Sequence, residues 1–547
     1  MSASRHLRPG LFFLWAGLSV ALALTPSRAG NPTSRPLTPE TRQAVNRGVE
    51  LEQSRKWGDA IMHYEKSCRQ FPDCGELEYG MRRSKVHLSV DRRYSDRSFE
   101  RNLLVRSRGE AMSLFEDIYR RTQSQYVEPV SLTSFVAHGT ESLYQALDEP
   151  RFLARHVPAD RRERAEAVRN ILRRPGDYWN RRLADFEDAR RFVEEVASLC
   201  QRELVVPPTA VWLEYVFGGC HALDDYSGLL TPGRYTDLMS NIHGNFVGLG
   251  VEIKAEPGQG MFLVNVLPGS PAAEGGLLKG EFITTIDGTD VTELNTDEAA
   301  NLLQGEAGSK VRLEVQRGKS TERRNLVLAR RPVEIQSIPV AQIVDQTSGV
   351  GYIQLTTFQD STARELDQAL ARLDQQGMQS LVLDVRGNPG GLLSAAVEVL
   401  DRFLAEGTLV QIRGPRQNET FTAKQPGTWT LPVVLLIDGD SASASEIVAG
   451  AFKDHRRGTI VGRRSFGKWS VQTIFQAKQQ CGLRVTTAKF YSPRGQNLAK
   501  VGLRPDIEVP EPPADRQSLR SATEVDVEGD EDLQQALRLL RNDLAAR

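Results

Sequence analysis

Hydrophobic and polar positions follow different patterns in successive parts of this chain. From about residue 100 to residue 235 apolar positions recur every three to four residues, as in Ala111–Tyr126, which predicts amphipathic helices. Beyond residue 334, short apolar runs such as Gly351–Leu355 alternate with helical segments such as Ser361–Gln376. Strands alternating with helices are typical of an α/β core. The pattern therefore predicts a multidomain α+β protein with a helical N-terminal region and an α/β core.

The most informative stretch lies between residues 432 and 472. The apolar run Val433–Ile437 predicts a buried strand, and the helical pattern of Ile447–Phe452 follows after a turn rich in Ser and Ala. Ser443 lies at this strand-to-helix turn, where backbone N–H groups and the positive end of a helix dipole favour a developing oxyanion. Further on, Lys468 lies between an aromatic residue and a Gly turn. Desolvation there would lower its pKa until it could act as a base.

These residues resemble those of the C-terminal processing (tail-specific) serine proteases, which use a Ser–Lys dyad. The resemblance rests on the run SASASEIVAGAFKD, followed by GKWSVQ. It implies that Ser443 is the nucleophile, that Lys468 is the base and that Gln472 supports the lysine. Positions four apart lie on one face of a helix and equally on one face of a strand, so Gln472 can reach Lys468 in either conformation.

A second motif, at residues 380–391, resembles the family's DLRxNxGG segment, in which a strand runs into a Gly-rich turn. The family binds the oxyanion with one glycine N–H and with the N–H that follows the nucleophile. This implies an oxyanion hole made by the N–H groups of Gly391 and Ala444, with the glycine that precedes Gly391 as the less favoured alternative to it. Asp384 and Arg386 are expected to brace the turn as an ion pair.

The surroundings of the lysine are predicted from its neighbours in the chain. Phe466 and Trp469 are expected to form the apolar cover over Lys468. Arg463 and Arg464, if close, would lower the lysine pKa further, because like charges disfavour the ammonium form.

Residues 236–333 resemble a PDZ domain. The segments Phe262–Val266, Gly269–Ala273 and Phe282–Gly288 fall where such a domain needs its next strands and helix. The resemblance implies a loop whose consecutive N–H groups bind the terminal carboxylate of a peptide, which then adds as a strand. The residues of this loop are Phe246, Val247, Gly248, Leu249, Gly250 and Val251.

The region before the protease is predicted to be helical between residues 40 and 95, with the spacing of a tetratricopeptide repeat. The matching positions are Gly48, Ala60, Tyr64 and Pro72. An ordinary helical hairpin is the alternative, and the region is a predicted site for a protein adaptor. Ala222–Ser227 resembles the LDPYS segment that precedes the PDZ domain in the family, so residues around 150–205 look like an insertion.

The predicted organisation has six parts. They are a signal peptide (1–29), a tetratricopeptide-like helical region (30–100), a helical part of the protease with an insertion near 150–205 (101–235), a PDZ domain (236–333), the catalytic core (334–510), and an acidic tail with a C-terminal helix (511–547).

Composition and charge limit the partners. Arg5 and Arg8 precede the apolar run Leu11–Leu24, and small residues follow at Ser27 and Ala29, which predicts a secretory signal. The protein is therefore expected to be exported, to a periplasmic or other extracytoplasmic space, with membrane contact only through an uncleaved signal anchor. The formal net charge of -1 argues against a nucleic-acid binder. No Cys/His spacing suggests zinc, so no metal and no cofactor is expected.

Three other interpretations of these residues compete with the Ser–Lys dyad. Ser443–Glu446 also fits a capping box, S-x-x-E, which needs no chemistry. Gly462–Lys468 nearly matches a phosphate-binding loop, but Trp469 and a strand follow, so the nucleotide interpretation is rejected. A Ser-His-Asp triad is disfavoured because His455 would lie ~18 Å along a helix from the serine. His243 could approach it only through a contact that the sequence does not predict.

The non-enzymatic alternative is a scaffold that uses the PDZ and tetratricopeptide-like parts around a silent protease core. Degeneration would show at the serine, the lysine or the glycines of the oxyanion hole, and all of these are present. The sequence therefore predicts an exported serine endopeptidase that binds protein substrates by their apolar C-termini and cleaves them.

Overall fold

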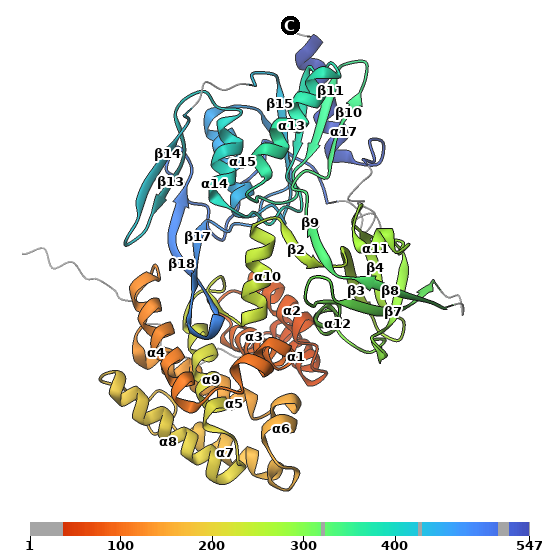
Figure 1. The fold of residues 1–547 in the computed structure, drawn as a ribbon. Coiled ribbons are helices and arrows are strands. Elements are labelled where there is room, and N and C mark those ends of the chain that lie inside the picture. The colour runs from red at the N-terminus through yellow and green to blue at the C-terminus, as the bar shows by residue number, and fades with distance from the viewer. Residues whose placement is uncertain (1–36, 319–322, 425–428, 512–524, 546–547) are drawn as a thin grey trace, which may run out of the picture. The chain divides into compact units, whose positions relative to one another are not determined.

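The computed structural model describes residues 37–318, 323–424, 429–511 and 525–545 (Figure 1). The signal peptide predicted at residues 1–29 lies outside the described residues. The chain divides into two compact units, residues 1–88 and 89–547, which are described separately. Within the described ranges, no helix combines the length and the apolar composition needed to span a bilayer.

The first unit is built from antiparallel helices that pack around one tyrosine. Its helices are α1 (Pro39–Gln53), α2 (Trp57–Gln70) and the first part of α3 (Gly75–Tyr94). The ring of Tyr64 is buried between Gly48 and Gly80, where an added Cβ would lie 2.2 Å and 2.4 Å from a ring carbon. Glycine at these two positions therefore lets the helices approach the ring closely. The assignment as a tetratricopeptide repeat stays a prediction.

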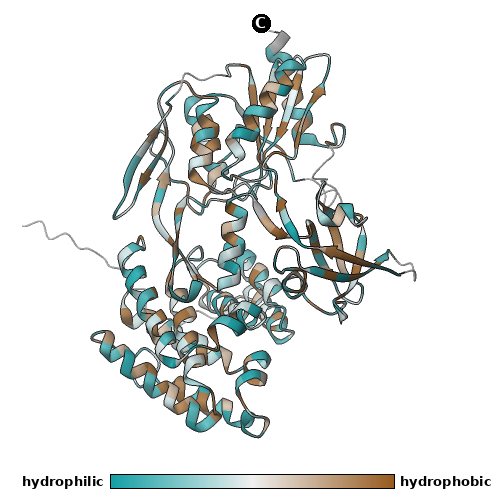
Figure 2. Ribbon diagram, viewed as in Figure 1, coloured by the Kyte–Doolittle hydropathy of each residue, from teal (hydrophilic) through white to brown (hydrophobic). Residues whose placement is uncertain are grey.

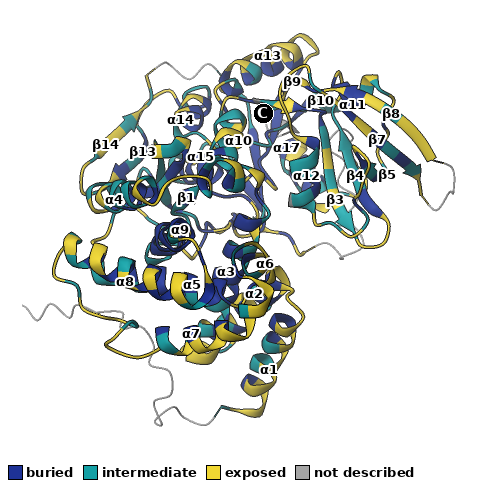
Figure 3. Cartoon of the chain, turned by 60° about the horizontal axis from the view of Figure 1, so that its bottom comes forward, coloured by how far each residue is buried: buried dark blue, intermediate teal, exposed yellow. Residues whose placement is uncertain are grey.

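The second unit begins with a helical region. Its elements are η1 (Phe99–Leu103), α4 (Arg108–Gln125), α5 (Leu132–Ala146), α6 (Pro150–His156), η2 (Ala159–Arg164), α7 (Ala165–Leu172), α8 (Phe186–Leu204), α9 (Pro208–Gly219), η3 (Cys220–Ala222), β1 (Gly228–Leu230) and α10 (Pro232–Ile242). The amphipathic helix expected at Ala111–Tyr126 is confirmed as α4. α9 is mostly apolar, and its residues Thr209–Gly219 are all buried, as the dark blue helix in Figure 3 shows, so it forms the centre of this region.

The region predicted as a PDZ domain is β-rich. Its elements are β2 (Asn245–Gly248), β3 (Val251–Glu256), β4 (Gly260–Val266), α11 (Pro271–Glu274), β5 (Glu281–Ile286), β6 (Thr289–Asp290), α12 (Thr296–Leu303), β7 (Lys310–Arg317), β8 (Arg323–Ala329) and β9 (Arg331–Glu334). The main sheet has the order β3-β4-β5-β7-β8, and β2 pairs with β9. The strands expected at 262–266 and 282–288 are confirmed as β4 and β5. β3 lies at the edge of its sheet, which is the position at which a peptide strand could add.

The core contains a six-stranded sheet and a second, five-stranded one. The first consists of β10 (Val340–Asp345), β11 (Val350–Gln354), β12 (Ser380–Asp384), β15 (Val433–Ile437), β16 (Thr459–Gly462) and β19 (Ile507–Glu508), in that order. All neighbours are parallel except β10 and β11. The second sheet consists of β1, β18 (Gly482–Tyr491), β13 (Thr408–Arg413) and β14 (Asn418–Thr422), and β17 (Ser470–Gln476) also pairs with β18.

Helices cover both faces of the six-stranded sheet, because its side chains alternate between two hydrophobic clusters. Leu381, Leu383 and Leu435 face α13 (Thr362–Gln375), α14 (Leu393–Asp401) and α15 (Ala444–His455). Val434 and its neighbours face α17 (Glu531–Ala545) at the C-terminus of the chain. The hydrophobic strands between these helices are brown in Figure 2. β15 therefore lies inside the sheet, and its carboxyl end, where parallel α/β sheets place their sites, leads directly into α15.

Candidate active site

The nucleophile turn joins β15 to α15, as predicted. Ser443 immediately precedes α15 with φ 57° and ψ −110°, a conformation that is strained for a residue with a Cβ. Ser441 and Ser445 are buried, and their hydroxyls donate to the carbonyls of Val385 at 2.8 Å and Asn388 at 3.0 Å. Ser443 alone of the three serines is partly exposed. The turn therefore uses two serines as structural donors and presents the third.

The Gly-rich turn after β12 lies against the nucleophile. A Cβ on Gly390 would be 2.8 Å from the Cβ of Ser443 and 2.9 Å from the nitrogen of Ala444. The N–H of Gly390 donates to Asn388 Oδ1 at 2.8 Å. Within the described part of the chain, the N–H groups of Gly391 and Ala444 have no acceptor. These two groups, the ones expected for the oxyanion hole, are thus the ones left available.

A buried carboxylate joins the nucleophile turn to the lysine loop. Oε2 of Glu446, on the first turn of α15, accepts hydrogen bonds from the backbone N–H of Ser443 at 3.0 Å and from that of Lys468 at 2.8 Å. Its Oε1 accepts from three further donors, Ser465 Oγ at 2.6 Å, Gly467 N at 2.8 Å and Trp469 Nε1 at 3.0 Å. The Ser443 and Lys468 nitrogens are therefore no farther apart than the sum of two hydrogen-bond lengths.

From the sequence, Glu446 is expected only to cap the helix. The carboxylate half of that box is formed, since Glu446 accepts from the N–H of the residue before the helix. The further donors come from a loop that the capping motif does not include. One signal in the sequence indicates this role. Glu446 lies on a helix turn whose other positions are apolar or small, so its carboxylate would be buried and would need several hydrogen-bond donors.

The side chain of Lys468 is partly buried, and its Nζ lies 5.3 Å from the ring centroid of Tyr226. Burial lowers the lysine pKa below its ordinary value, and the positive charge of Arg484 acts in the same direction. Asp224 and Glu446 oppose this shift without cancelling it. Among the described residues, Ser443 and Lys468 share no side-chain hydrogen bond. Catalytic hydrogen bonds are often loose in structures without substrate.

The cover over the lysine differs from the one expected. Phe466 is 54% exposed, and Trp469 stacks its ring on another buried aromatic residue. The guanidinium of Arg463 is held by an aspartate at the start of α17. Tyr226, far from the lysine in the sequence, supplies the ring, and Arg484, on the paired strand β18, supplies the positive charge. Immediate neighbours in the chain were the wrong guide here, because the pairing of β1, β17 and β18 decides which side chains reach this point.

Gln472 and Lys468 share no hydrogen bond among the described residues. Its amide donates to Ser470 Oγ at 2.8 Å and to Thr486 Oγ1 at 3.3 Å. Lys468 precedes β17, and the pairing register of β17 shifts between Val471 and Gln472, which interrupts the alternation of faces. The supporting role of Gln472 stays a prediction.

The histidines have other partners. His455, at the end of α15, contacts the carbonyl of Thr408 at 2.7 Å, and the exposed His243 pairs with Asp360 at 2.8 Å. No histidine in the described ranges hydrogen-bonds to Ser443. The geometry therefore does not contain a Ser-His-Asp triad among these residues.

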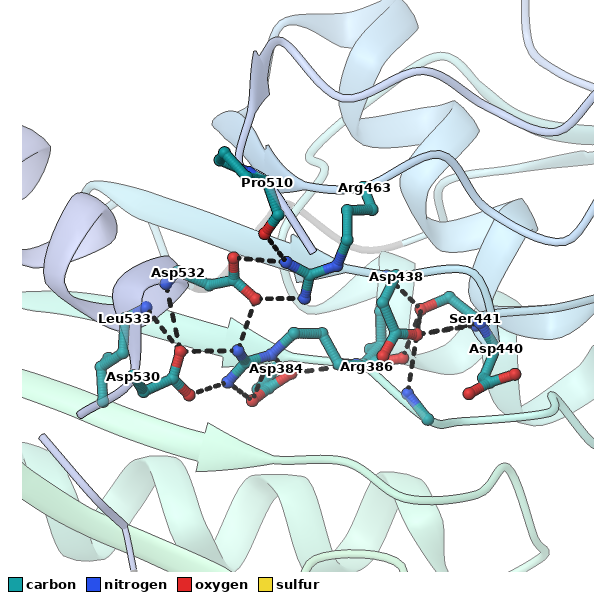
Figure 4. Close-up of polar contacts among 12 residues, drawn as sticks. Asp384, Arg386, Asp438, Asp440, Ser441, Arg463, Pro510, Asp530, Asp532 and Leu533 are labelled. Carbon is teal, nitrogen blue, oxygen red and sulfur yellow. Dashed lines mark hydrogen bonds and ion pairs between the residues drawn. The ribbon is translucent and has the colours of Figure 1, made fainter. Parts of the chain in front are cut away.

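The ion pair expected to brace the Gly-rich turn is confirmed and belongs to a larger group (Figure 4). Arg386 lies 2.6 Å from Asp384 and 2.7 Å from both Asp530 and Asp532. Burial alone would lower the pKa of Arg386, but Asp384 and Asp530 outweigh it and raise that pKa well above its ordinary value. The turn is thus anchored by a guanidinium that stays charged.

In the PDZ region, only Leu249 and Gly250 of the carboxylate-binding loop predicted at Phe246–Val251 lie between β2 and β3, because the residues before them belong to β2 and pair with β9. Among the described residues, the N–H groups of Leu249 and Gly250 have no acceptor. Gly250 has φ 78°, and a Cβ there would lie 2.2 Å from Ser270. The loop therefore requires glycine at this position, and it leaves two consecutive donors available to a carboxylate.

The sequence and the fold match known protein families, relatives and solved structures. A model of peptidase family S41 matches residues 349–509, and a PDZ domain model matches residues 262–317. The chain is 34% identical over 335 residues to a carboxy-terminal-processing protease of Bartonella bacilliformis, covering 60% of this chain and 76% of that protein. It is 35% identical over 326 residues to a carboxyl-terminal-processing protease of Synechocystis sp., covering 59% of this chain and 75% of that protein. Among solved structures, the photosystem II D1 C-terminal processing protease aligns over 73% of this chain and 92% of that one, with 26% identity and a TM-score of 0.38.

Proposed function

This chain belongs to the carboxyl-terminal-processing proteases of peptidase family S41, serine proteases that here carry a PDZ domain, and on that premise we propose that Ser443 and Lys468 form its catalytic dyad. The observation that carries the proposal is the shared oxygen of Glu446, which accepts from the backbone N–H of both residues. This contact keeps the two residues together independently of their side-chain rotamers.

In the proposed reaction, the Oγ of Ser443 attacks the scissile carbonyl while neutral Lys468 takes the hydroxyl proton. The negative oxygen of the tetrahedral intermediate accepts from the N–H groups of Gly391 and Ala444, each worth about 3 kcal/mol in such a hole. The protonated lysine then gives its proton to the leaving amine as the peptide C–N bond breaks. Water, deprotonated by the same lysine, hydrolyses the acyl-enzyme ester and releases Ser443.

The lowered pKa of Lys468 supports this role, because a base must be neutral at the working pH. The scaffold alternative is not favoured, since the chain belongs to a family of proteases and retains the serine, the lysine and both N–H donors of the site.

The dyad is tested by Ser443→Ala with Ser441→Ala and Ser445→Ala as matched controls. Ser443→Ala should abolish cleavage of a tagged protein with an apolar C-terminus, and Lys468→Arg should do the same, since a guanidinium keeps its proton. Each control loses only the hydrogen bonds of one structural hydroxyl, which should cost about 1 kcal/mol of stability per bond, and should remain active. Cleavage is followed on gels and stability by thermal melting. An active Ser443→Ala or Lys468→Arg enzyme would refute the dyad.

We also propose that the PDZ domain selects substrates by capturing an apolar C-terminus at the loop Phe246–Val251, with the peptide added along β3. Leu249 and Gly250 offer the N–H groups. A substrate with a free C-terminal carboxylate should be cleaved about tenfold more efficiently than the same substrate amidated, because the amide cannot accept these hydrogen bonds as an anion does. Steady-state kcat/KM values for the pair give the result, and equal values would remove the loop from substrate selection.

Export is the last part of the proposal. The predicted signal at residues 1–29 would place the mature enzyme outside the cytoplasm, where an adaptor could bind the N-terminal helical unit. N-terminal sequencing of the protein recovered from the expressing cell should give a first residue at Gly30. An intact N-terminus on protein recovered from the cytoplasm would contradict export.

A further inference from the structure

The beginning of α17 lies at the carboxyl ends of the strands that carry the active site (Figure 4). Asp530 Oδ1 accepts from the backbone N–H of Asp532 at 3.1 Å and of Leu533 at 3.2 Å, which fixes the first turn of the helix. Leu533, next to Asp532 in the chain, is fully buried against the six-stranded sheet. The position of Asp532 is therefore set both by a cap and by packing.

Asp532 joins two arginines that belong to different loops. Its Oδ2 accepts from Arg386 Nη1 at 2.7 Å, and its two oxygens accept from Arg463 Nη1 at 3.0 Å and Nη2 at 2.5 Å. The side chains of Asp532 and Arg386 are 2% and 4% exposed. Charges buried to this degree are held firmly by their partners, and removing one of them leaves another uncompensated.

The two arginines stand on either side of the strand that leads to the nucleophile. Arg386 follows β12 and Arg463 follows β16, while β15 lies between these strands. The backbone N–H of Arg463 also donates to Ile437, the last residue of β15, at 3.0 Å. Asp532 therefore spans the nucleophile strand from one neighbour to the other.

Each arginine leads into a different part of the active site. From Arg386 the chain continues into the Gly-rich turn, whose Asn388 carbonyl accepts from Ala442 N and Ser445 Oγ of the nucleophile turn, each at 3.0 Å. From Arg463 the chain continues through the loop that binds Glu446 and carries Lys468. Contact with both arginines thus connects the oxyanion side of the site with the base side.

We propose that Asp532 is a positioning residue of the active site, which sets the spacing between the Gly-rich turn and the lysine loop by holding Arg386 and Arg463 on one carboxylate. This inference rests on the roles proposed above for Gly391 and Lys468. Asp532 does not touch the reacting atoms and acts only through the two loops. An amide cannot replace it, because one acceptor oxygen would become an NH2 donor facing guanidinium N–H groups.

The test uses Asp532→Asn in the full-length enzyme, assayed on a fluorogenic peptide with a free apolar C-terminus. We expect kcat to fall ~10- to 100-fold, because a displacement of about 1 Å at a catalytic group costs up to that much, with a much smaller change in KM. Arg463→Met should cause a comparable loss. The double variant should be no slower than the slower single one, since both changes remove the same contact.

Two changes in the same helix separate positioning from stability. Leu537→Ala opens a cavity against the sheet and should lower the melting temperature while the folded fraction keeps the parent kcat. Arg541→Ala removes the contact with Asp345 at 2.8 Å, away from both loops, and should leave kcat unchanged. The folded, competent fraction is counted by titrating the reactive serine with a fluorophosphonate.

The inference is overturned if folded Asp532→Asn or Arg463→Met keeps the parent kcat, or if their losses only follow the unfolded fraction as in Leu537→Ala. Should Asp532→Asn not fold, Arg463→Met decides the question alone, because its Asp532 partner remains paired with Arg386. A failure of the dyad would appear separately, as residual activity in Ser443→Ala.

Discussion

The nucleophile turn and the lysine loop, which together make the site, are built in different ways. Ser443 is placed by its own backbone conformation and by contacts from two short motifs, around residues 385–391 and 438–446. The pKa of Lys468 is set by burial, by Arg484 on the paired strand β18 and by Asp224, which comes from a remote part of the chain, as does Tyr226, whose ring lies beside the ammonium. The position of the nucleophile is thus a local property, whereas the basicity of the lysine is a property of the assembled fold.

The largest effect is expected from Gly390→Ala, which tests whether local geometry places the nucleophile. Gly390 has φ 101°, and a Cβ would lie 2.7 to 2.9 Å from atoms of the nucleophile turn. Displacing the turn misaligns Ser443 and the N–H of Ala444 together, so activity should fall by about 10³-fold, as for loss of an oxyanion donor. The measurement is kcat on the fluorogenic peptide.

Gly387→Ala is the matched control for this change. Gly387 lies in the same turn with φ 68°, but an added Cβ would meet nothing within 4 Å. It should cost about 1 to 2 kcal/mol of stability from the left-handed backbone and leave kcat near the parent value. Equal losses in the two variants would mean that strain, and not contact with the nucleophile, is responsible.

The next effect in size is expected at the link between the two regions. Glu446→Gln keeps the shape of the side chain but turns one acceptor oxygen into a donor, which faces N–H groups of Ser443 and Lys468 or of their neighbours. We expect kcat to fall by about 100-fold through misalignment. Ser465→Ala removes only one donor to Glu446 and should cost a few-fold. Parent-like activity in Glu446→Gln would show that the shared carboxylate does not hold the dyad.

The smallest expected effects are two opposite shifts in the pH–rate profile, which test whether residues from other segments set the pKa of Lys468. Arg484 lowers the pKa of Lys468, so Arg484→Met should raise that pKa and move the limb on which activity appears to higher pH. Asp224 raises the pKa, so Asp224→Asn should move the limb to lower pH. At neutral pH these shifts should change kcat/KM by about a few-fold, down and up respectively.

The sign of the two shifts decides the outcome. If the two variants shift the limb in the same direction, Arg484 and Asp224 do not tune the base. The same conclusion follows if neither variant shifts the limb while Lys468→Arg still inactivates the enzyme. Full pH–rate profiles of the parent and both variants are therefore needed, with KM measured at each pH.

The same division explains how much the sequence predicted. The turn at Ser443, the strand before it and the Gly-rich motif are specified by neighbouring residues, and the structure confirms these elements. The N–H groups of Gly391 and Ala444, which have no acceptor among the described residues, follow from the same local geometry. Nothing next to Lys468 in the chain indicated Tyr226, because that contact depends on how β1, β17 and β18 pair.

Two acidic residues were underestimated for a related reason. Glu446 matched a capping motif, and that motif is satisfied, but its other donors lie in a loop that becomes a neighbour only after folding. Asp532 lay in the segment predicted as an acidic tail with a C-terminal helix, and that helix is confirmed as α17. Its arginine partners could not be chosen from the sequence, since many arginines are available and sequence separation does not restrict which of them are close.

The packing of α17 also has a consequence for quality control in the cell. Residues 531–545 cover one face of the six-stranded sheet and follow every strand of that sheet in the sequence. Translation therefore delivers the strands before the helix that covers them. A chain that stops or is clipped before this helix would expose Val434 and its neighbours, a hydrophobic surface that chaperones and other proteases recognise. We therefore expect copies that lack this helix to be removed by the cell.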